Sequence, residues 1–389
     1  MISRRSKSLA ACCAAVACLA LAAAAQTNVP DQVFVKGKAE GEVAITSARV
    51  DKDDLAQVSF STEDKSLSVD STLVLRIVWG DVPRSFREAN AALERRRFER
   101  AATKFKMAAL DPAAREVVRA AAQLSVASTL LAWGASEPAR YREAASTAHA
   151  FVVSFPTNRE VPRARMLEAR ATWLGGNAAD AAVMFRMLYG ELRGDTPTVG
   201  YDRSLCLDAG LCAARASLDA ADALIARELY RALAAQTSRL LSELPASPAV
   251  RRDLGAILDE ASMGDGFAAL AEGATERATA VFQGQLGGAA EATSQGRLLV
   301  ADLGLGETLL AAGRPREAAL HFARVCALDD TLDRDRAARA TLGLARCFAR
   351  EQEENGRAQA RTRLAALLAD LGNTPAAFRA RGLLAELGR

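Results

Sequence analysis

The chain has 389 residues, 50% of them apolar and 25% charged, with a formal net charge of +3. This length exceeds what one compact core usually fills, so it predicts two or more structural units. Arg4, Arg5 and Lys7 supply the entire net charge, because the 50 basic residues less these three equal the 47 acidic ones. A balanced remainder argues against a general nucleic-acid-binding protein.

The N-terminus has the pattern of a secretory signal peptide. Its three cations precede an uncharged apolar run, 9–25, that ends in three alanines. The run is shorter than the ~20 residues of a spanning helix, so we expect residues 1–25 to be cleaved and the protein to be exported. The expected location is the periplasm or the cell envelope. A lipid anchor on Cys18 is the alternative, although the apolar run continues past that cysteine. We expect no transmembrane segment after the signal.

Residues 26–82 differ from the rest of the chain because their apolar residues alternate with a period of two. Such alternation between turn residues is typical of short strands that bury one face. The expected strands are 32–36, 41–46, 57–61, 66–69 and 73–79. They predict a small all-β domain of the SH3-like or Sm-like barrel type, with a short sandwich or meander as the alternative. We place the junction at 79–83 and interpret Trp79 as a packing residue between the two units.

Residues 83–389 repeat one spacing of small and aromatic residues. In the best copy, Gly306 is followed after twelve residues by Ala318 and then by Phe322 at four more. Ala318 and Phe322 share one helical face, and small residues allow two helices to approach closely. Between them, 313–315 reads Gly-Arg-Pro, which predicts the end of one helix and the start of the next.

This spacing resembles the tetratricopeptide repeat (TPR), although Asp302 and Leu309 stand where that family has Trp and Tyr. Six further, more degenerate copies are centred on Ala101/Phe105, Ala144/Phe151, Ala181/Phe185, Ala226/Tyr230, Ala278/Phe282 and Ala360/Leu364. The resemblance implies a mainly α fold, in which about seven helical hairpins form a solenoid over 83–389. We expect Ser247 and Pro248 to open an additional helix, and 375–387 to form a capping helix with Leu383 and Leu384 on its apolar side.

In the family that the repeat resembles, the first helices of successive repeats line a concave groove that binds a segment of another protein. The exposed arginines that we expect on those helices are Arg95, Arg163, Arg165, Arg170, Arg297, Arg339 and Arg346. They suggest a groove that binds acidic side chains or a C-terminal carboxylate. The competing interpretation is that these arginines pair at the surface with Glu88, Glu168 and Asp302.

The sequence offers no pattern of residues for catalysis, a metal or a cofactor. Its two histidines, His149 and His321, lie several repeats apart and cannot serve one site. The cysteines that follow the N-terminal run are Cys206, Cys212, Cys326 and Cys347. We expect all four to be buried free thiols, because their spacing suits neither a disulfide nor a metal.

Three functional hypotheses follow from this. The first is a non-catalytic exported scaffold or adaptor whose partner is a protein or peptide of the cell envelope. The second is an envelope-assembly or cell-division accessory lipoprotein. The third is a cell-wall-acting enzyme or glycan-binding protein, which would need a catalytic cluster that the sequence does not reveal.

Overall fold

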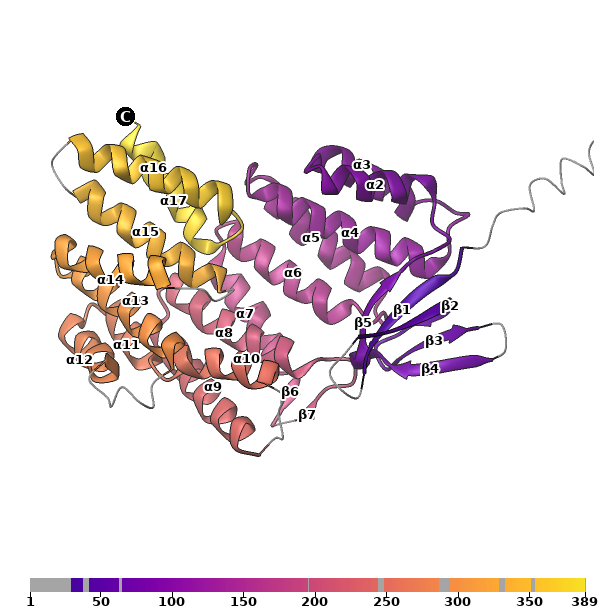
Figure 1. The fold of residues 1–389 in the computed structure, drawn as a ribbon, viewed down its shortest axis with the longest axis horizontal. Coiled ribbons are helices and arrows are strands. Elements are labelled where there is room, and N and C mark those ends of the chain that lie inside the picture. Colours follow the sequence, from indigo (N-terminus) through magenta and orange to yellow (C-terminus); the bar gives the residue numbers. More distant parts are fainter. Residues whose placement is uncertain are drawn as a thin grey trace, which may run out of the picture.

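A computed structural model describes residues 29–37, 42–62, 65–194, 196–243, 248–286, 294–328, 333–350 and 354–388. The expected signal peptide, the alternative lipid anchor at Cys18 and the expected N-cap Ser247 lie outside the described residues. Figure 1 shows a small sheet at one end of a long array of helices. None of the helices in the described ranges has the length and apolarity to cross a membrane.

The sheet has five antiparallel strands in the order β4-β3-β2-β1-β5. The strands are β1 Asp31–Lys36, β2 Glu42–Asp53, β3 Gln57–Ser61, β4 Ser66–Asp70 and β5 Val74–Val78, with a short 3-10 helix, η1 Ser71–Leu73, before the last. All five expected strands are confirmed. Because β5 pairs with β1, the sheet curls into a half-barrel around Val33, Val58 and Phe60, all less than 2% exposed. The expected small all-β domain is therefore confirmed, with its sheet forming a half-barrel.

The rest of the chain is mainly α-helical, and consecutive helices pack as antiparallel pairs. The helices are α2 Arg84–Glu94, α3 Phe98–Ala109, α4 Glu116–Gly134, α5 Arg140–Ser154, α6 Val161–Leu174, α7 Ala178–Tyr189, α8 Arg203–Asp219, α9 Ala223–Glu243, α10 Pro248–Ala261, α11 Gly264–Ala271, α12 Thr275–Leu286, α13 Gln295–Ala311, α14 Pro315–Leu328, α15 Arg334–Arg350, α16 Glu354–Asp370 and α17 Pro375–Leu387. The expected additional helix is α10. A short hairpin of β6 Leu192–Arg193 and β7 Thr196–Pro197 was not predicted.

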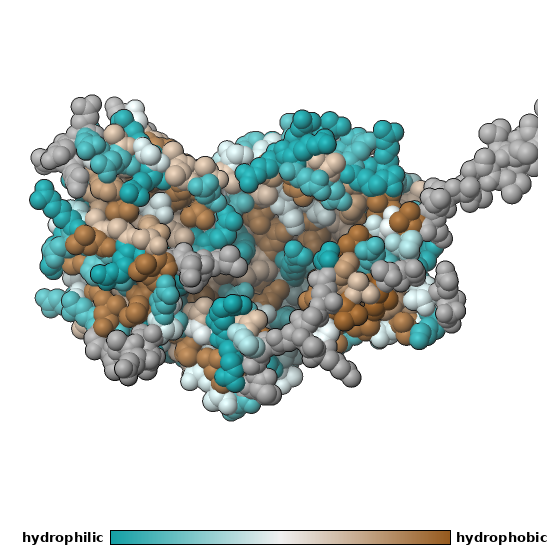
Figure 2. Space-filling view, viewed as in Figure 1, coloured by the Kyte–Doolittle hydropathy of each residue, from teal (hydrophilic) through white to brown (hydrophobic). Residues whose placement is uncertain are grey.

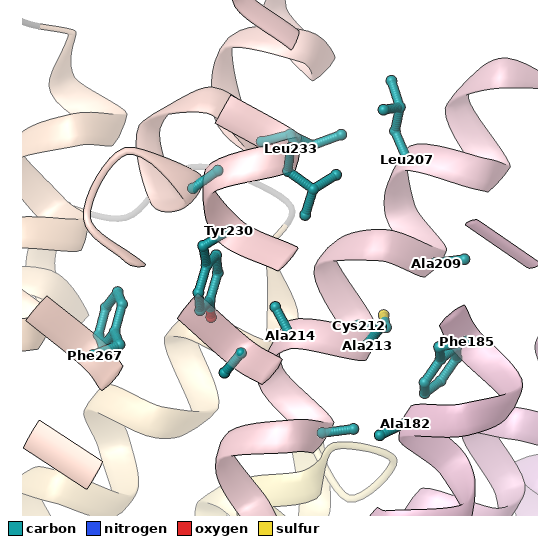
Figure 3. Packing of buried hydrophobic residues seen from close by; sticks show 14 of the residues in the cluster. Ala182, Phe185, Leu207, Ala209, Cys212, Ala213, Ala214, Tyr230, Leu233 and Phe267 are labelled. Atoms are coloured by element: carbon teal, nitrogen blue, oxygen red, sulfur yellow. The ribbon is translucent and has the colours of Figure 1, made fainter. Parts of the chain in front are cut away.

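Several hairpins are held by an aromatic ring that fits against small residues. Phe322 of α14 lies between α13 and α15, where a Cβ added at Gly306 or Gly343 would come within 2.8 and 2.4 Å of its ring. Phe282 of α12 occupies the same position between Gly266 and Gly304. Figure 3 shows the equivalent arrangement around α8, whose alanines lie between residues of α7 and α9. The small and aromatic positions of the predicted repeat are thus its packing core.

The half-barrel is fixed to the helices by specific contacts. The carboxylate of Asp31 on β1 accepts two hydrogen bonds from the Arg115 guanidinium, at 2.7 and 2.8 Å, just before α4. The amide of Leu55 donates to the carbonyl of Thr157 at 2.7 Å, between α5 and α6. Trp79 packs against both the sheet core and the first helical core, which confirms the packing role expected of it.

The C-terminal helix α17 does more than cap the stack. Its apolar side, including Leu383 and Leu384, packs on α15 and α16 as expected. Its other side contacts the turns after α4 and α6 and the end of α8, far back in the chain. The solenoid therefore closes on itself, and Figure 2 shows apolar surface in the hollow between its C-terminal helices and α5–α6.

Candidate binding groove

The groove of this solenoid is a half-open cavity of about 440 Å³. Its walls come from α6, α8, α11, α13 and α15, which are first helices of their hairpins, and from α17. Its apolar lining is Trp173, Leu218, Phe267, Leu270, Leu310 and Leu342. This volume lies within the range typical of ligand pockets, and the cavity runs across the concave side of several repeats.

Beneath the groove lies a buried network of ionised side chains around Arg215 of α8. Its guanidinium donates to both oxygens of Glu260 on α10, at 2.8 and 2.5 Å, and to Asp333 and Asp335 at 3.0 and 3.2 Å. Burial alone would raise the pKa of Asp333, but Arg215 and the backbone N–H of Arg336 lower it to about 2. The network joins three helices that are distant in sequence and keeps the groove floor fixed.

A second charged system extends from this network toward the mouth of the groove. Arg339 of α15 is ion-paired with Glu307 at 2.9 Å, and its guanidinium lies 4.8 Å from the centroid of the Phe267 ring. Glu307 and Phe267 line the cavity together with Arg339. Burial of Arg339 is compensated by Glu307 and Glu260, which raise its pKa. Arg339 is therefore a structural cation of the groove wall.

The mouth of the groove is rich in arginine. Arg346 and Arg350 of α15 and Arg379 of α17 line the cavity, and the first two also border an adjoining hollow of about 620 Å³ with Arg357 and Arg361 of α16. Burial, then the nearby charges of Arg379 and Arg350, lower the pKa of Arg346. Cations that destabilise one another in this way favour the approach of an anion.

The structure brings only two of the seven predicted arginines, Arg339 and Arg346, to the groove. Arg95 is exposed at the end of α2. Arg163 is 74% exposed and lies 3.7 Å from Glu160, beside a smaller cavity of about 160 Å³ against β5. The expected position of an arginine on a first helix therefore did not suffice to predict whether that arginine lines the groove.

The other three predicted arginines have partners within the chain. Arg165 donates to the Tyr201 hydroxyl at 2.7 Å and to Glu191 at 3.1 Å. The Nε of Arg297 donates to the Gln285 side chain at 2.7 Å, at the start of α13. Cys212, then Asp335 and Asp208, raise the pKa of Arg170 against the effect of burial. Fixed partners make these arginines poor candidates for binding a ligand.

The acids that were expected to neutralise the arginines pair elsewhere. Glu88 binds Arg84 and Lys104 at 2.7 and 2.8 Å. Glu168 lies 3.1 Å from His149, and Asp302 lies 2.8 Å from His321. The expectation that these three acids pair with the predicted arginines is wrong, because the helices place them beside other side chains.

The groove residues that sequence reasoning missed are Arg215, Arg350, Arg379 and the aromatic side chains of Trp173 and Phe267. Arg215 offered one signal, because it stands alone among the small apolar residues of α8. A lone arginine in an apolar helical face needs a buried anion. The sequence could not identify that anion, since Glu260 is 45 residues away.

The described ranges bring together no set of metal ligands, and they show the state of the four cysteines. No group of three or more His, Cys, Asp or Glu side chains there could hold a metal ion. The four cysteines are free, but the expectation that all are buried is wrong, because Cys326 is exposed on α14. Burial raises the pKa of Cys206 to about 12 and that of Cys212 to about 11, so both are protonated at neutral pH.

No family model and no curated protein matches the chain. Among solved structures, it is similar to a crystal structure of a tetratricopeptide repeat protein from Parabacteroides merdae ATCC 43184. The two are 12% identical, with a TM-score of 0.46 over 79% of this chain and all of the other. The description of the helical region as a series of TPR-like hairpins rests on the packing of consecutive helices within this chain.

Proposed function

We propose that this protein is a non-catalytic scaffold that binds a segment of another protein in the groove between α6 and α17. The observation that carries the proposal is the cavity itself, to which α6, α8, α11, α13 and α15 all contribute. Helical-repeat solenoids commonly bind partners on the concave surface that successive repeats build together. An extended segment would cross several repeats and use each of them.

The lining suggests what such a segment would carry. Its apolar side chains would contact Phe267, Leu310 and Leu342, and a carboxylate would approach Arg346 at the mouth. Arginine binds carboxylates through two parallel hydrogen bonds, which gives direction as well as attraction. We therefore propose an acidic or C-terminal segment as the partner, with Arg346 as the predicted arginine that contacts it.

The cellular setting of the proposal comes from the N-terminal sequence. Its cations and apolar run support export, and a partner in the cell envelope would then share the compartment. An accessory lipoprotein with its anchor on Cys18 is the alternative form of this proposal. Mass spectrometry of the mature N-terminus distinguishes them, because cleavage after residue 25 leaves no cysteine to lipidate there, whereas lipidation leaves an acylated Cys18.

The proposal is tested by cross-linking a C-terminally tagged full chain in its native cells and identifying the proteins that co-purify. The test variant is Arg346→Glu, and the matched control is Arg95→Glu, which reverses an exposed arginine at the end of α2. We expect one or two stoichiometric partners that Arg346→Glu loses and Arg95→Glu retains. Equal capture by both variants would contradict binding in this groove.

A further inference from the structure

We infer that α17 is a gate for the groove, which opens when the contacts between α17 and the turns of the earlier repeats are released. The inference rests on the proposed function for what the groove binds. It concerns a separate property, namely how a partner gains access. The structure described here is the closed form, in which Pro375, Ala376 and Arg379 form one wall of the cavity.

One face of α17 is a permanent attachment. Ala376, Ala377 and Ala380 are at most 1% exposed and pack with Leu364 and Leu367 of α16. Leu383, Leu384 and Leu387 extend the same apolar contact toward the end of the helix. Burial of this kind is the main source of stability in packed helices, so α17 stays on α15 and α16.

The opposite face of α17 and the turn before it make a different kind of contact with the earlier repeats. Arg379 pairs with Asp219 at the end of α8 at 2.7 Å, and Arg381 donates to the carbonyl of Ala135 at 2.5 Å. The hydroxyl of Tyr141 donates to the carbonyl of Gly372 at 3.1 Å. These contacts are polar, and the side chains of Arg379 and Asp219 are 37% and 24% exposed.

Two rings take part in this contact: the ring of Tyr141 is fully buried, whereas that of Phe378 remains half in solvent. Phe378 is 47% exposed and lies over Gly176, where an added Cβ would be 3.1 Å from the ring. One half-exposed ring and a partly exposed ion pair stabilise this contact less than the apolar attachment stabilises the other face of α17. When the two compete, α17 parts from the end of α8 and from the turns of the earlier repeats, and it stays attached to α15 and α16.

Asp219 connects the gate directly to the groove wall. Its Oδ1 binds Arg379, while its Oδ2 accepts the indole N–H of Trp173 at 3.0 Å. Both residues line the cavity. An acidic partner that reaches Arg379 would compete with Asp219 for the same guanidinium. The partner would thereby release the contact that holds the groove closed.

The test uses the full chain with Asp219→Arg, which places two arginines opposite each other, and the double variant Asp219→Arg/Arg379→Asp, which restores an ion pair with reversed polarity. The readouts are the radius of gyration from small-angle X-ray scattering and the acrylamide quenching of tryptophan fluorescence, to which Trp173 contributes together with Trp79 and Trp133. Exposed Glu94→Arg is the control for a change of charge alone. Circular dichroism checks that every variant remains helical.

We expect Asp219→Arg to increase the radius of gyration and quenching, and the double variant, which restores the ion pair, to return the radius of gyration toward the wild-type value. In the cross-linking assay, we expect Asp219→Arg to capture roughly fivefold more partner, the factor that follows from losing one half-exposed ion pair. Unchanged scattering in Asp219→Arg would overturn the gate. Opening without any change in capture would also overturn it, while the scaffold would stand. Opening with no partner captured by any variant would instead refute the proposed function alone.

Discussion

At the scale of single residues, Asp31 binds partners from three separate segments of the chain. It is 1% exposed and accepts hydrogen bonds from the backbone N–H groups of Val50 and Gly80 as well as from Arg115. Burial would raise its pKa, but the hydrogen bonds from Arg115, Val50 and Gly80 outweigh burial and lower it. One carboxylate thus joins two strands of the half-barrel to the start of α4.

We expect Asp31→Asn to lower the free energy of unfolding by about 3 kcal/mol, because it leaves Arg115 without its buried anion. Since the pKa of Asp31 is lower in the folded state, its contribution is present above about pH 4 and is lost as the pH falls through the folded-state pKa. Urea unfolding at pH 7 and pH 3 would measure this. The deficit of the variant should shrink at pH 3, whereas exposed Glu94→Gln should change little at either pH.

At the scale of the elements, the hairpin depends on glycine beneath an aromatic ring. We expect Gly343→Ala to destabilise the protein by about 1–3 kcal/mol, because its Cβ would lie 2.4 Å from the ring of Phe322. Gly382 of α17 is the matched control, because an added Cβ there meets no atom within 4 Å. Gly382→Ala should stabilise slightly through helix propensity. Thermal unfolding of both variants measures the two shifts, and shifts of the same sign would contradict the account.

The elements were largely predictable, because each follows from a local periodicity. Alternation with a period of two located the five strands, and the spacing of Gly, Ala and Phe located the hairpins. The hairpin of β6 and β7 was missed, since two-residue strands leave no periodic pattern.

The residues of the binding surface were harder to predict than the helices and strands. Whether Arg165 or Arg346 faces the groove depends on which partners, such as Tyr201, the folded chain brings near each of them.

At the scale of the whole molecule, the closure of the solenoid could not be read from the sequence. A repeat contacts its neighbours, so the pattern predicts adjacent packing and says nothing of residues 231 apart, such as Tyr141 and Gly372. Closure depends on small rotations that accumulate over many hairpins. The same holds for the ion network at the groove floor, which joins Arg215 to Asp335 over 120 residues.

That network supports a last prediction, which concerns the whole assembly of repeats. Arg215 is 8% exposed and is the shared cation of Glu260, Asp333 and Asp335. Replacing it in Arg215→Met leaves three carboxylates close together in the interior. We expect a loss of about 3–5 kcal/mol at pH 7, the cost of breaking a buried ion pair by removing one partner.

The pH dependence separates this charge effect from a simple packing defect. In the wild type, burial would raise the pKa of Glu260 and Asp333, but Arg215 helps to lower both, so their stabilisation is lost only as the pH falls through these lowered pKa values. In Arg215→Met the carboxylates would instead bind protons more readily, and protonation would relieve their repulsion. The deficit should therefore shrink between pH 7 and pH 4.5 in urea unfolding.

Arg165→Met is the control, because it removes a more exposed arginine that is paired with Glu191. It should cost under about 1 kcal/mol at both pH values. A deficit in Arg215→Met that did not change with pH would mean that α8 is held by packing and that the buried charges add little.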